Sequence, residues 1–444
     1  MGREKRQGWS TGVKVTELRA VEKQLGAFVE EFASELGRAE RRHWGKQYIV
    51  GLLLDGERKS IEPMAQRVPG GNEQALQQFV NQSPWAHEPV QIKLYRRLVQ
   101  RSGSGKGVLV LDDTSLPKKG KHSVGVAPQY CGALGKVANC QAIVTWHYSG
   151  ARRHFPLLGE LYLPQSWTAA PGKLRQAGVP PTKWQFQEKW KLALELLDHF
   201  RAELPYEAIV TDAGYGEIRP FLHALDQRQQ LFVAQIPEAH CFWPATVVVE
   251  ERGKLGGRPR RFPMIADPHA QPLSAKAWRQ QAEAGKLRWQ KITLALQRKK
   301  TVAVAAVRVR ETTTQAWRRP GPERWLLIER HRDGSYKYYL SNAPPHTSVK
   351  QMVGWAHHRW QIEQGYQQRK EELGLDHFEG RSWRGLHHHL TLCFLAYGFL
   401  QLLRQKKKRP LDSASSASLA QSPLPLHPMP TVSGVSSCAA NSAL

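Results

Sequence analysis

Five short apolar runs between Gly107 and Pro237 constrain the fold of this chain more than any other feature. They read GVLVLDD, QAIVTWHYS, HFPLLGELYLP, YEAIVTDAG and LFVAQIP, and each has the length and the β-branched or aromatic content of a strand. A helical pattern, KWQFQEKWKLALELLDHFRAEL, precedes the fourth run. Strands interleaved with a helix predict an α/β fold in which helices cover a sheet.

The flanking segments have different patterns. Residues 15–106 are helical in pattern, and SIEPMAQRVPGGNEQALQQFVNQSPW contains two short helical stretches joined by Gly70 and Gly71. That arrangement fits a helix-turn-helix DNA-binding unit and a plain helical bundle equally well. Residues 238–335 are basic and rich in strand-like runs, and strand-then-helix order resumes only at Tyr336. We therefore predict a β-rich insertion over 238–335 that divides the α/β region into 107–237 and 336–404.

The last two predicted helices and the chain ends complete this division. The helices run from Val349 to Leu373 and from Trp383 to Arg404. Residues 1–14 and the tail 405–444, which is rich in Ser, Ala and Pro, are expected to be disordered.

The charge balance points to a polyanionic partner. The chain has 64 Lys and Arg against 38 Asp and Glu, a formal net charge of +26. Such an excess favours binding to nucleic acid through its phosphates, and an anionic membrane is the weaker alternative because no strongly apolar amphipathic segment accompanies the charge. The longest apolar stretch, Leu390 to Leu403, is too short to span a bilayer. The 5 cysteines of the chain lack the spacing of a zinc site, and we expect reduced thiols in a cytoplasmic protein.

Two of the predicted strands end in carboxylates. Asp112 or Asp113 closes the first run, and Asp212 closes the fourth, where Gly214 and Gly216 allow close approach of a ligand or another backbone. A single strand-end aspartate is most often a cap or turn residue. Ligands gather at the carboxyl ends of strands in open sheets, so two such aspartates can share one site. Crowded carboxylates repel each other, and Mg²⁺, which prefers hard oxygen ligands, relieves that repulsion.

A third carboxylate lies in the predicted helix GWAHHRWQIEQGYQQRKEEL. At 100° per residue, Arg359, Glu363, Tyr366 and Lys370 fall at about 0°, 40°, −20° and 20°, on one narrow face. An exposed Arg359–Glu363 pair is ordinarily a modest surface ion pair. With Lys370 on the same face, we predict instead that Glu363 holds metal while its cationic neighbours hold phosphates.

These motifs together resemble one branch of the bacterial insertion-sequence transposases of the DDE type. LDDTSLPKKGKHSVGVAPQYCGALGKVANCQ is similar to the first-aspartate region of that branch, and VTDAGYG is similar to the second. RWQIEQGYQQRK matches the R-x3-E-x6-K part of its Y-x2-R-x3-E-x6-K signature, and YYLSNAP and RSWRGLHHHLTL add to the likeness. The resemblance extends from roughly Arg41 to Arg404.

The resemblance implies a fold and a metal site. The fold is an RNase H-like mixed sheet with flanking helices, interrupted by the β-rich insertion and preceded by a helical N-terminal DNA-binding domain. Asp112, Asp212 and Glu363, here called the acidic triad, would hold two Mg²⁺ ions, for which Mn²⁺ can substitute. The family's Asp-x-Thr pattern favours Asp112 over Asp113 as the first ligand, and only one of these strand neighbours can face the site.

The resemblance and the charge pattern also single out DNA contacts. Ala356 occupies the position of the signature tyrosine, for which Tyr366 on the same helical face can substitute. His387, His388 and His389 are consecutive in a helix and cannot chelate one ion together, so they either pack or contact phosphate. GKLGGRPRR suits an A·T-rich minor groove or a solvated loop. The predicted DNA contacts are Arg359, Lys370, Tyr366, Lys118, Lys119, Lys121, Arg258 and Arg260.

The implied activity is metal-dependent DNA strand cleavage and strand transfer in cut-and-paste transposition. Its partners would be double-stranded DNA, comprising the terminal inverted repeats and the target, and a second copy of the chain, because two DNA ends must be joined. The protein would act without a membrane, in the bacterial cytoplasm and on the nucleoid. Two alternatives remain: an RNase H-like hydrolytic nuclease without strand transfer, and a catalytically decayed protein that only binds DNA.

Overall fold

A mixed sheet lies at the centre of the computed structural model, which describes residues 15–102, 106–150, 153–250, 263–294, 300–313 and 319–406. Its middle strands run in the order β4-β3-β1-β5-β6. β1 pairs antiparallel with β3 and β3 antiparallel with β4, whereas β5 lies parallel to both β1 and β6. This topology confirms the predicted RNase H-like fold class. The strands are β1 (Gly107–Pro117), β3 (Lys136–Ser149), β4 (His154–Leu161), β5 (Tyr206–Thr211) and β6 (Phe232–Ile236).

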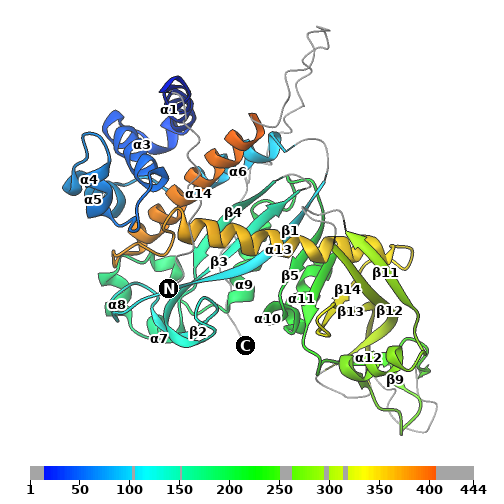
Figure 1. The fold of residues 1–444 in the computed structure, drawn as a ribbon. Helices are drawn as coiled ribbons and strands as arrows, with labels where there is room; N and C mark the ends of the chain where they lie inside the picture. Colours follow the sequence, from blue (N-terminus) through cyan, green and yellow to red (C-terminus); the bar gives the residue numbers. More distant parts are fainter. Residues whose placement is uncertain are drawn as a thin grey trace, which may run out of the picture.

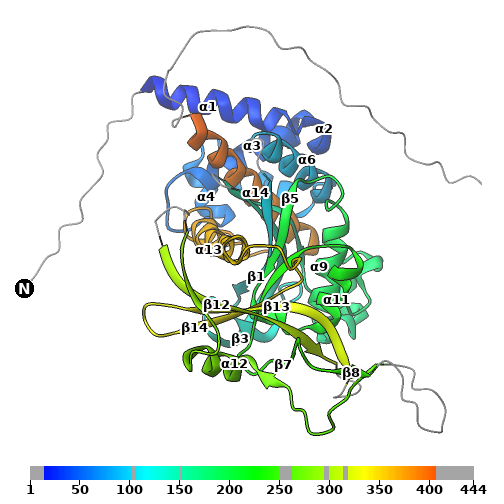
Figure 2. The same cartoon turned by 90° about the vertical axis from the view of Figure 1, so that its right-hand side faces the viewer.

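Helices cover both faces of these strands. Helix α13 (Val349–Glu371) crosses one face over β1 and β5, and α9 (Lys189–Asp198) and α11 (Arg219–Gln227) lie on the other (Figures 1 and 2). Because both faces are covered, the strands are buried along most of their length, and every residue of β4 is buried. This explains why the predicted strands are continuous apolar runs without alternation.

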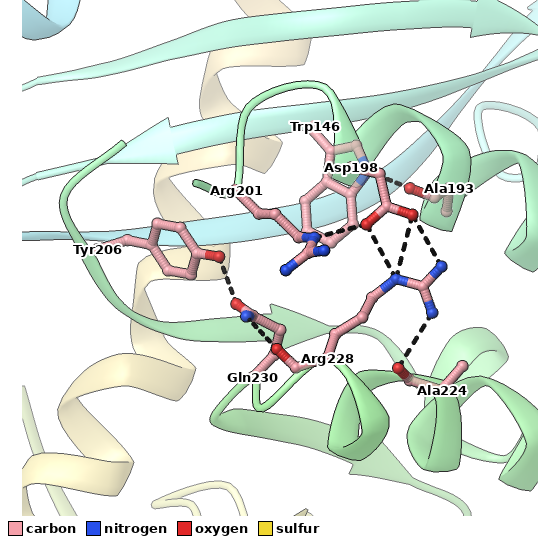
Figure 3. Close-up of polar contacts among 8 residues, drawn as sticks. All are labelled: Trp146, Ala193, Asp198, Arg201, Tyr206, Ala224, Arg228 and Gln230. Carbon is pink, nitrogen blue, oxygen red and sulfur yellow. Dashed lines mark hydrogen bonds and ion pairs between the residues drawn. The ribbon is translucent and has the colours of Figure 1, made fainter. Parts of the chain in front are cut away.

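Polar contacts fasten α9 to the sheet and join the ends of α9 and α11, as Figure 3 shows. The indole Nε1 of the fully buried Trp146 donates to the Ala193 carbonyl at 2.8 Å. At the end of α9, Asp198 accepts from Arg228 at 2.8 Å and from Arg201 at 2.6 Å. The buried indole thus holds α9 against the sheet. The ion cluster, which is partly exposed to solvent, joins the ends of α9 and α11.

The N-terminal helices form a layer that packs on α14 (Trp383–Lys406) at one end of the sheet (Figure 1). Between α4 and α5 the chain turns at Gly70, which has φ 69°, and at Gly71, where a Cβ would meet the Ala65 carbonyl oxygen at 2.0 Å. The helix-turn-helix interpretation of this pair stays a prediction. The six helices are α1 (Val15–Glu30), α2 (Ala33–Leu36), α3 (Ala39–Leu53), α4 (Ile61–Arg67), α5 (Glu73–Asn81) and α6 (His87–Gln100).

The strand-rich segment that begins at residue 238 extends the central sheet. Strand β14 (Tyr336–Ser341) pairs with β6, and the order then continues β13-β12-β7-β10, with β11 also beside β12. Strands β8 and β9 form a separate pair. The elements are β7 (Cys241–Pro244), β8 (Val249–Glu250), β9 (Met264–Ile265), β10 (Leu273–Ser274), α12 (Ala275–Glu283), β11 (Trp289–Leu294), β12 (Lys300–Thr312) and β13 (Pro320–Arg330).

Two predicted elements have other limits than expected, and one observed strand was not predicted. β1 does not end at Asp112 or Asp113, because its antiparallel pairing with β3 continues to Pro117. The helix expected from Lys183 begins only at Lys189, after a short 3-10 turn at Pro181–Lys183. The hairpin partner of β3, β2 (Ala127–Cys131), was not predicted, since its sequence is short and half polar. The remaining short helices are α7 (Gln165–Thr168), α8 (Pro171–Gln176) and α10 (Ala213–Gly216).

The predictions on thiols and membrane spans apply to the described part of the chain. Cys131, Cys140, Cys241 and Cys393 are free thiols, in agreement with the expectation of reduced cysteines. Within the described ranges, no helix combines the length and apolar character needed to cross a bilayer. The tail was expected to be disordered from residue 405, but α14 continues to Lys406. The rest of the expected disorder concerns residues 1–14 and 407–444, which lie outside these ranges.

A buried arginine joins the insertion to the central sheet's helices. Arg324 on β13 is 6% exposed, and its guanidinium donates to Glu311 of β12 at 2.5 Å and to Asp226 of α11 at 3.2 Å. Asn342 donates to the same aspartate at 2.9 Å. Burial lowers the pKa of Arg324, but the two carboxylates outweigh this and raise it. This cluster therefore fixes the strand-rich segment against α11.

Replacing Arg324 with Met should destabilise the protein, because two carboxylates lose their counter-ion while Glu311 stays buried. We expect a loss of roughly 3 kcal/mol, the lower end of the range for broken buried pairs, since Asp226 is 25% exposed. The measurement is the urea midpoint of Arg324→Met against wild type. Arg58→Met, which breaks the exposed Arg58–Glu379 pair, is the control and should cost less than about 1 kcal/mol. Equal losses in the two variants would contradict the assignment.

Candidate active site

Asp112 and Asp212 lie side by side in the sheet. The parallel pairing of β1 with β5 ends at Leu111 opposite Thr211, and the next residues are Asp112 and Asp212. Neighbouring strands are about 4.8 Å apart, so these residues meet at the carboxyl edge of the sheet. The structure thereby brings together two members of the acidic triad that are far apart in the sequence.

Asp112 and Asp113 have different surroundings. The Asp113 carboxylate accepts from Lys189 Nζ at 2.7 Å and from the Tyr215 hydroxyl at 2.6 Å. Asp112 is 8% exposed, and its carboxylate accepts the backbone N–H of Asp113 at 3.0 Å. Asp113 is thus neutralised within the protein, whereas, within the described part of the chain, Asp112 has no direct contact with a lysine or arginine. This contrast favours Asp112 as the residue available to a metal.

The charge state of Asp112 reflects this environment. Burial raises the pKa of Asp112 to about 7; the Arg359 guanidinium opposes the shift, and the negative charges of Asp212 and Asp113 add to it. A buried carboxylate beside another carboxylate is the condition that a bound cation relieves. The donor set of hard oxygens fits Mg²⁺ or Mn²⁺.

Asp212 begins the short helix α10. Its Oδ1 accepts from the Tyr215 N–H at 3.1 Å, and its side chain is half-buried. A Cβ at Gly216 would come within 1.9 Å of the Gln235 carbonyl oxygen, so only glycine allows β6 to approach here. This confirms the expected close approach at Gly216, with the backbone of β6 as the neighbour. The turn after β5 therefore holds Asp212 against the edge of the sheet.

Helix α13 lies over this edge, and the face predicted from the sequence contacts the sheet. Arg359 donates to Gln235 Oε1 of β6 at 3.3 Å, and Lys370 Nζ donates to the Ser115 carbonyl of β1 at 3.0 Å. Glu363 belongs to α13 and, by helical periodicity, to the face that these two residues define. Its side chain lies outside what the structure describes. The backbone of α13 thus positions Glu363 above β1 and its neighbours.

Tyr366 lies deeper than a DNA contact would require. It is 8% exposed, and its hydroxyl hydrogen-bonds with Thr145 and, at 3.0 Å, with His147 Nε2. Thr145 in turn donates to the Asp112 carbonyl at 3.0 Å. The structure therefore gives Tyr366 inward contacts that support the backbone of Asp112, in place of the solvent-facing position expected from the sequence.

Arg369 is a buried cation that the sequence analysis missed. It is 0% exposed, and its guanidinium lies over the rings of Tyr366 at 4.5 Å and Tyr397 at 5.0 Å. Within the described residues its three side-chain nitrogens have no hydrogen-bond acceptor. Burial lowers the pKa of Arg369, and nearby anionic groups including Asp112 oppose that shift. Only its position one turn after Tyr366 hinted at this role.

The predicted basic DNA contacts are placed as follows. Lys119 and Lys121 are exposed, whereas Lys118 Nζ donates inward to the Phe378 carbonyl at 2.5 Å. These lysines belong to a loop beside a cavity of about 380 Å³ that Arg58, His122 and Arg381 also line. Arg258 and Arg260 lie outside the described residues.

The remaining predicted positions are buried. Ala356 is 4% exposed, so the position of the signature tyrosine faces the protein interior here. His388 contacts the carbonyl oxygens of Val80 and Trp85 at 2.8 Å each, and His389 contacts Tyr48 at 2.9 Å. The packing interpretation fits these contacts of His388 and His389. As predicted, the three consecutive histidines do not converge on one ion.

Two partners of the carboxylates escaped sequence analysis. Lys189, which neutralises Asp113, lies far along the chain at the start of α9, and no local pattern links the two. Burial lowers the pKa of Lys189, but Asp113 outweighs this and raises it. Tyr215 follows Asp212 by three residues in VTDAGYG, and its position in that motif was the available signal.

Comparison with known proteins agrees with this geometry. A family model described as "DDE superfamily endonuclease" matches residues 31–301, a range that includes both aspartates and ends before α13. A curated protein of Microchaete diplosiphon, "Probable transposase for insertion sequence element IS701", is 28% identical over 197 residues. The alignment covers 44% of this chain and 49% of that protein, so the match spans about half the length of this relative.

Replacing Asp112 with Asn should stabilise the metal-free protein at high pH. The pKa of Asp112 is raised from 3.8 to about 7, so its contribution to stability is present below pH 3.8 and is lost as the pH rises towards 7. Asn carries no charge and avoids that loss. In EDTA at pH 8 we expect Asp112→Asn to be more stable by about 2–4 kcal/mol, and near wild type at pH 4.

Asp113→Asn is the matched control for this measurement. Lys189 and Tyr215 would lose a charged acceptor, so this variant should be less stable than wild type by about 1–2 kcal/mol at pH 8. Thermal unfolding from pH 4 to pH 8 in EDTA measures both. A stabilised Asp113→Asn and a destabilised Asp112→Asn would reverse the assignment of the two residues.

Proposed function

The chain belongs to the DDE superfamily of endonucleases, and from this premise we propose that it is the DNA transposase of an insertion sequence. It would bind the element's terminal inverted repeats, cleave the strands there and transfer them to target DNA by cut-and-paste transposition. The name of the relative from Microchaete diplosiphon, a probable transposase, supports the transposase assignment over other endonuclease roles.

One observation carries the proposal: Asp112 and Asp212 directly follow the last paired residues of two adjacent parallel strands, and Asp112 is buried without a direct cationic partner among the described residues. A folded protein ordinarily pairs or neutralises a buried carboxylate. Here the neighbouring Asp113 is paired and Asp112 is not. Such a site is organised for a cation supplied from solution.

We assign the metal ligands to the acidic triad of Asp112, Asp212 and Glu363. They would hold two Mg²⁺ ions, for which Mn²⁺ can substitute. Divalent ions bound there would activate water for the first nick and the freed 3′-hydroxyl for in-line attack on target DNA. In this scheme Glu363 completes the ligand set from α13, whose neighbouring turns rest on β6 and β1.

Other residues would prepare the site or hold the substrate. Arg359 and Lys370 flank Glu363 on α13 and supply positive charge for the phosphates next to the scissile bond. Tyr366, through Thr145, would keep the backbone of Asp112 in place. Tyr366 is thus a positioning residue in this scheme, which replaces the DNA contact expected from the sequence.

A path for the DNA backbone is proposed beside the metal site. The cavity next to Lys118 and Lys119 is lined from three parts of the chain: Arg58 of the N-terminal layer, the loop after β1, and Arg381 before α14. Its cations outnumber its acids, Asp376 and Glu379, and would attract phosphates. Arg258 and Arg260 remain proposed minor-groove contacts on sequence grounds.

The proposal includes a homodimer in the active complex, because two element ends must be joined, and a place of action on the bacterial nucleoid. A hydrolytic nuclease with the same metal site is the main alternative. A decayed copy that only binds DNA is the other, which the buried Ala356 at the signature position keeps in view. The unpaired Asp112 favours an active enzyme over that copy.

Asp212→Ala should abolish strand cleavage and leave binding of end DNA largely intact. The loss follows because one of the carboxylates that would hold the metal is removed, while the basic surface is unchanged. The assay measures nicking of a labelled duplex carrying the DNA that flanks the coding region, with Mg²⁺, and binding by gel shift. Asp198→Asn, at a partly exposed ion pair behind the sheet, is the control and should cleave normally. Cleavage at the wild-type rate by Asp212→Ala would refute the scheme.

A second arm of this assay separates the alternatives. End DNA and a supercoiled plasmid are incubated together with wild-type protein and Mg²⁺. A transposase joins the two molecules, whereas a nuclease shortens the end DNA without forming joint products. A DNA-binding protein without activity shifts the duplex and does not respond to Mg²⁺.

Replacing Lys119 and Lys121 with Ala should weaken DNA binding evenly across sequences. If each contacts one phosphate, the slope of log K against log salt should become shallower by about 0.9 per lysine. Fluorescence anisotropy between low and moderate salt measures the slope. Lys276→Ala with Lys286→Ala, two exposed lysines of the strand-rich segment, is the control pair. An equal reduction in that pair would remove the special role of the loop after β1.

A further inference from the structure

Three side chains outside the acidic triad converge where the N-terminal layer meets the sheet. His87 is the first residue of α6, Glu160 lies on β4, and His387 lies on α14. One donor atom from each lies within 4.8 Å of the other two. The three elements pack on one another, so the cluster sits at a junction of segments distant in sequence (Figure 1).

His387 presents an unprotonated nitrogen to this cluster. It is 0% exposed, its Nδ1 contacts the Trp383 carbonyl at 2.9 Å, and a carbonyl can only accept. Nδ1 therefore carries the proton. Its Nε2 accepts an N–H from Leu161 at 3.3 Å, in agreement with that tautomer. A ring fixed by an Nδ1–H to carbonyl bond, with Nε2 as donor atom, is the usual arrangement of a metal-binding histidine.

Glu160 faces this nitrogen without a proton donor. Its Oε1 lies 3.5 Å from His387 Nε2 and, within the described residues, has no hydrogen-bond partner although Glu160 is 8% exposed. Two lone-pair atoms thus face each other across a buried gap, and a cation between them would remove the repulsion.

His87 makes a metal ion the better candidate for that cation than a proton. Its donor atom lies within 4.8 Å of those of Glu160 and His387, and it adds a third potential ligand of a type that zinc prefers. Lys183, the nearest lysine, is engaged with Glu195 at 2.9 Å. In a tetrahedral site with bonds of about 2.0–2.1 Å, neighbouring donors lie about 3.3–3.4 Å apart, close to the separation of His387 Nε2 and Glu160 Oε1.

We propose that His87, Glu160 and His387 form a zinc-binding site that pins α6 and α14 to β4, with water as the fourth ligand. Two imidazoles and one carboxylate are a donor set suited to Zn²⁺ and poorly suited to Mg²⁺. The site is separate from the acidic triad, and its role is to fasten the N-terminal layer to the catalytic sheet. Half-buried His87 gives the ion a route from solvent.

The test measures Zn²⁺ binding to the full chain after EDTA treatment, in excess Mg²⁺ so that the acidic triad is occupied. Wild type should retain about one Zn²⁺ per chain after desalting, measured by elemental analysis. Its unfolding temperature should rise by about 3–5 °C at a hundredfold excess of free Zn²⁺ over Kd. Both effects should be lost in His87→Gln and Glu160→Gln, which remove one ligand each with little change in size.

His346→Gln, which changes an exposed histidine elsewhere, is the matched control and should retain both effects. Because wild type alone reports stoichiometry and the temperature shift, the test does not depend on folding of the variants. Wild type that neither retains Zn²⁺ nor gains stability overturns the proposal and leaves a proton between His387 and Glu160. Equal Zn²⁺ content in wild type and His87→Gln overturns it as well. Neither result bears on DNA cleavage.

Discussion

The parallel pairing of β1 with β5 is the constraint on which the site depends. It ends at Leu111 and Thr211, so the chain direction and register place Asp112 beside Asp212. Helices on both faces then bury the edge, and burial raises the pKa of Asp112 to about 7. The same packing that stabilises the sheet thus creates an anionic site that is unfavourable until a cation binds.

The surroundings of the site divide its charges between structure and substrate. Asp113 is paired with Lys189 and Tyr215, which ties β1 to α9 and to the turn after β5. Tyr366 and the buried Arg369 support the site from α13, while Lys119 and Lys121 remain at the surface. A chain of formal charge +26 therefore uses some of its cations inside the fold and leaves others at the surface, where the proposed function assigns them to DNA.

Sequence patterns predicted which strands and helices exist better than the residues at which they begin and end. The five apolar runs became the central strands because strand length and apolar content are local properties. The end of β1 was misjudged because its last residues are held by pairing with β3, a contact between distant segments. The late start of α9 has a local cause instead: the Trp184 indole donates to the Val179 carbonyl at 2.9 Å, which turns the chain before the helix begins.

By itself, the sequence determined the mixed α/β class, the position of Asp212 after its strand, the basic composition and the helical face that carries Arg359 and Lys370. These follow from residue type and period along a single segment. Only the tertiary structure decided that Asp113 is the paired aspartate, that Tyr366 points inward, and that His87, Glu160 and His387 meet. Each of those outcomes depends on which distant segments pack together, and no local pattern encodes that choice.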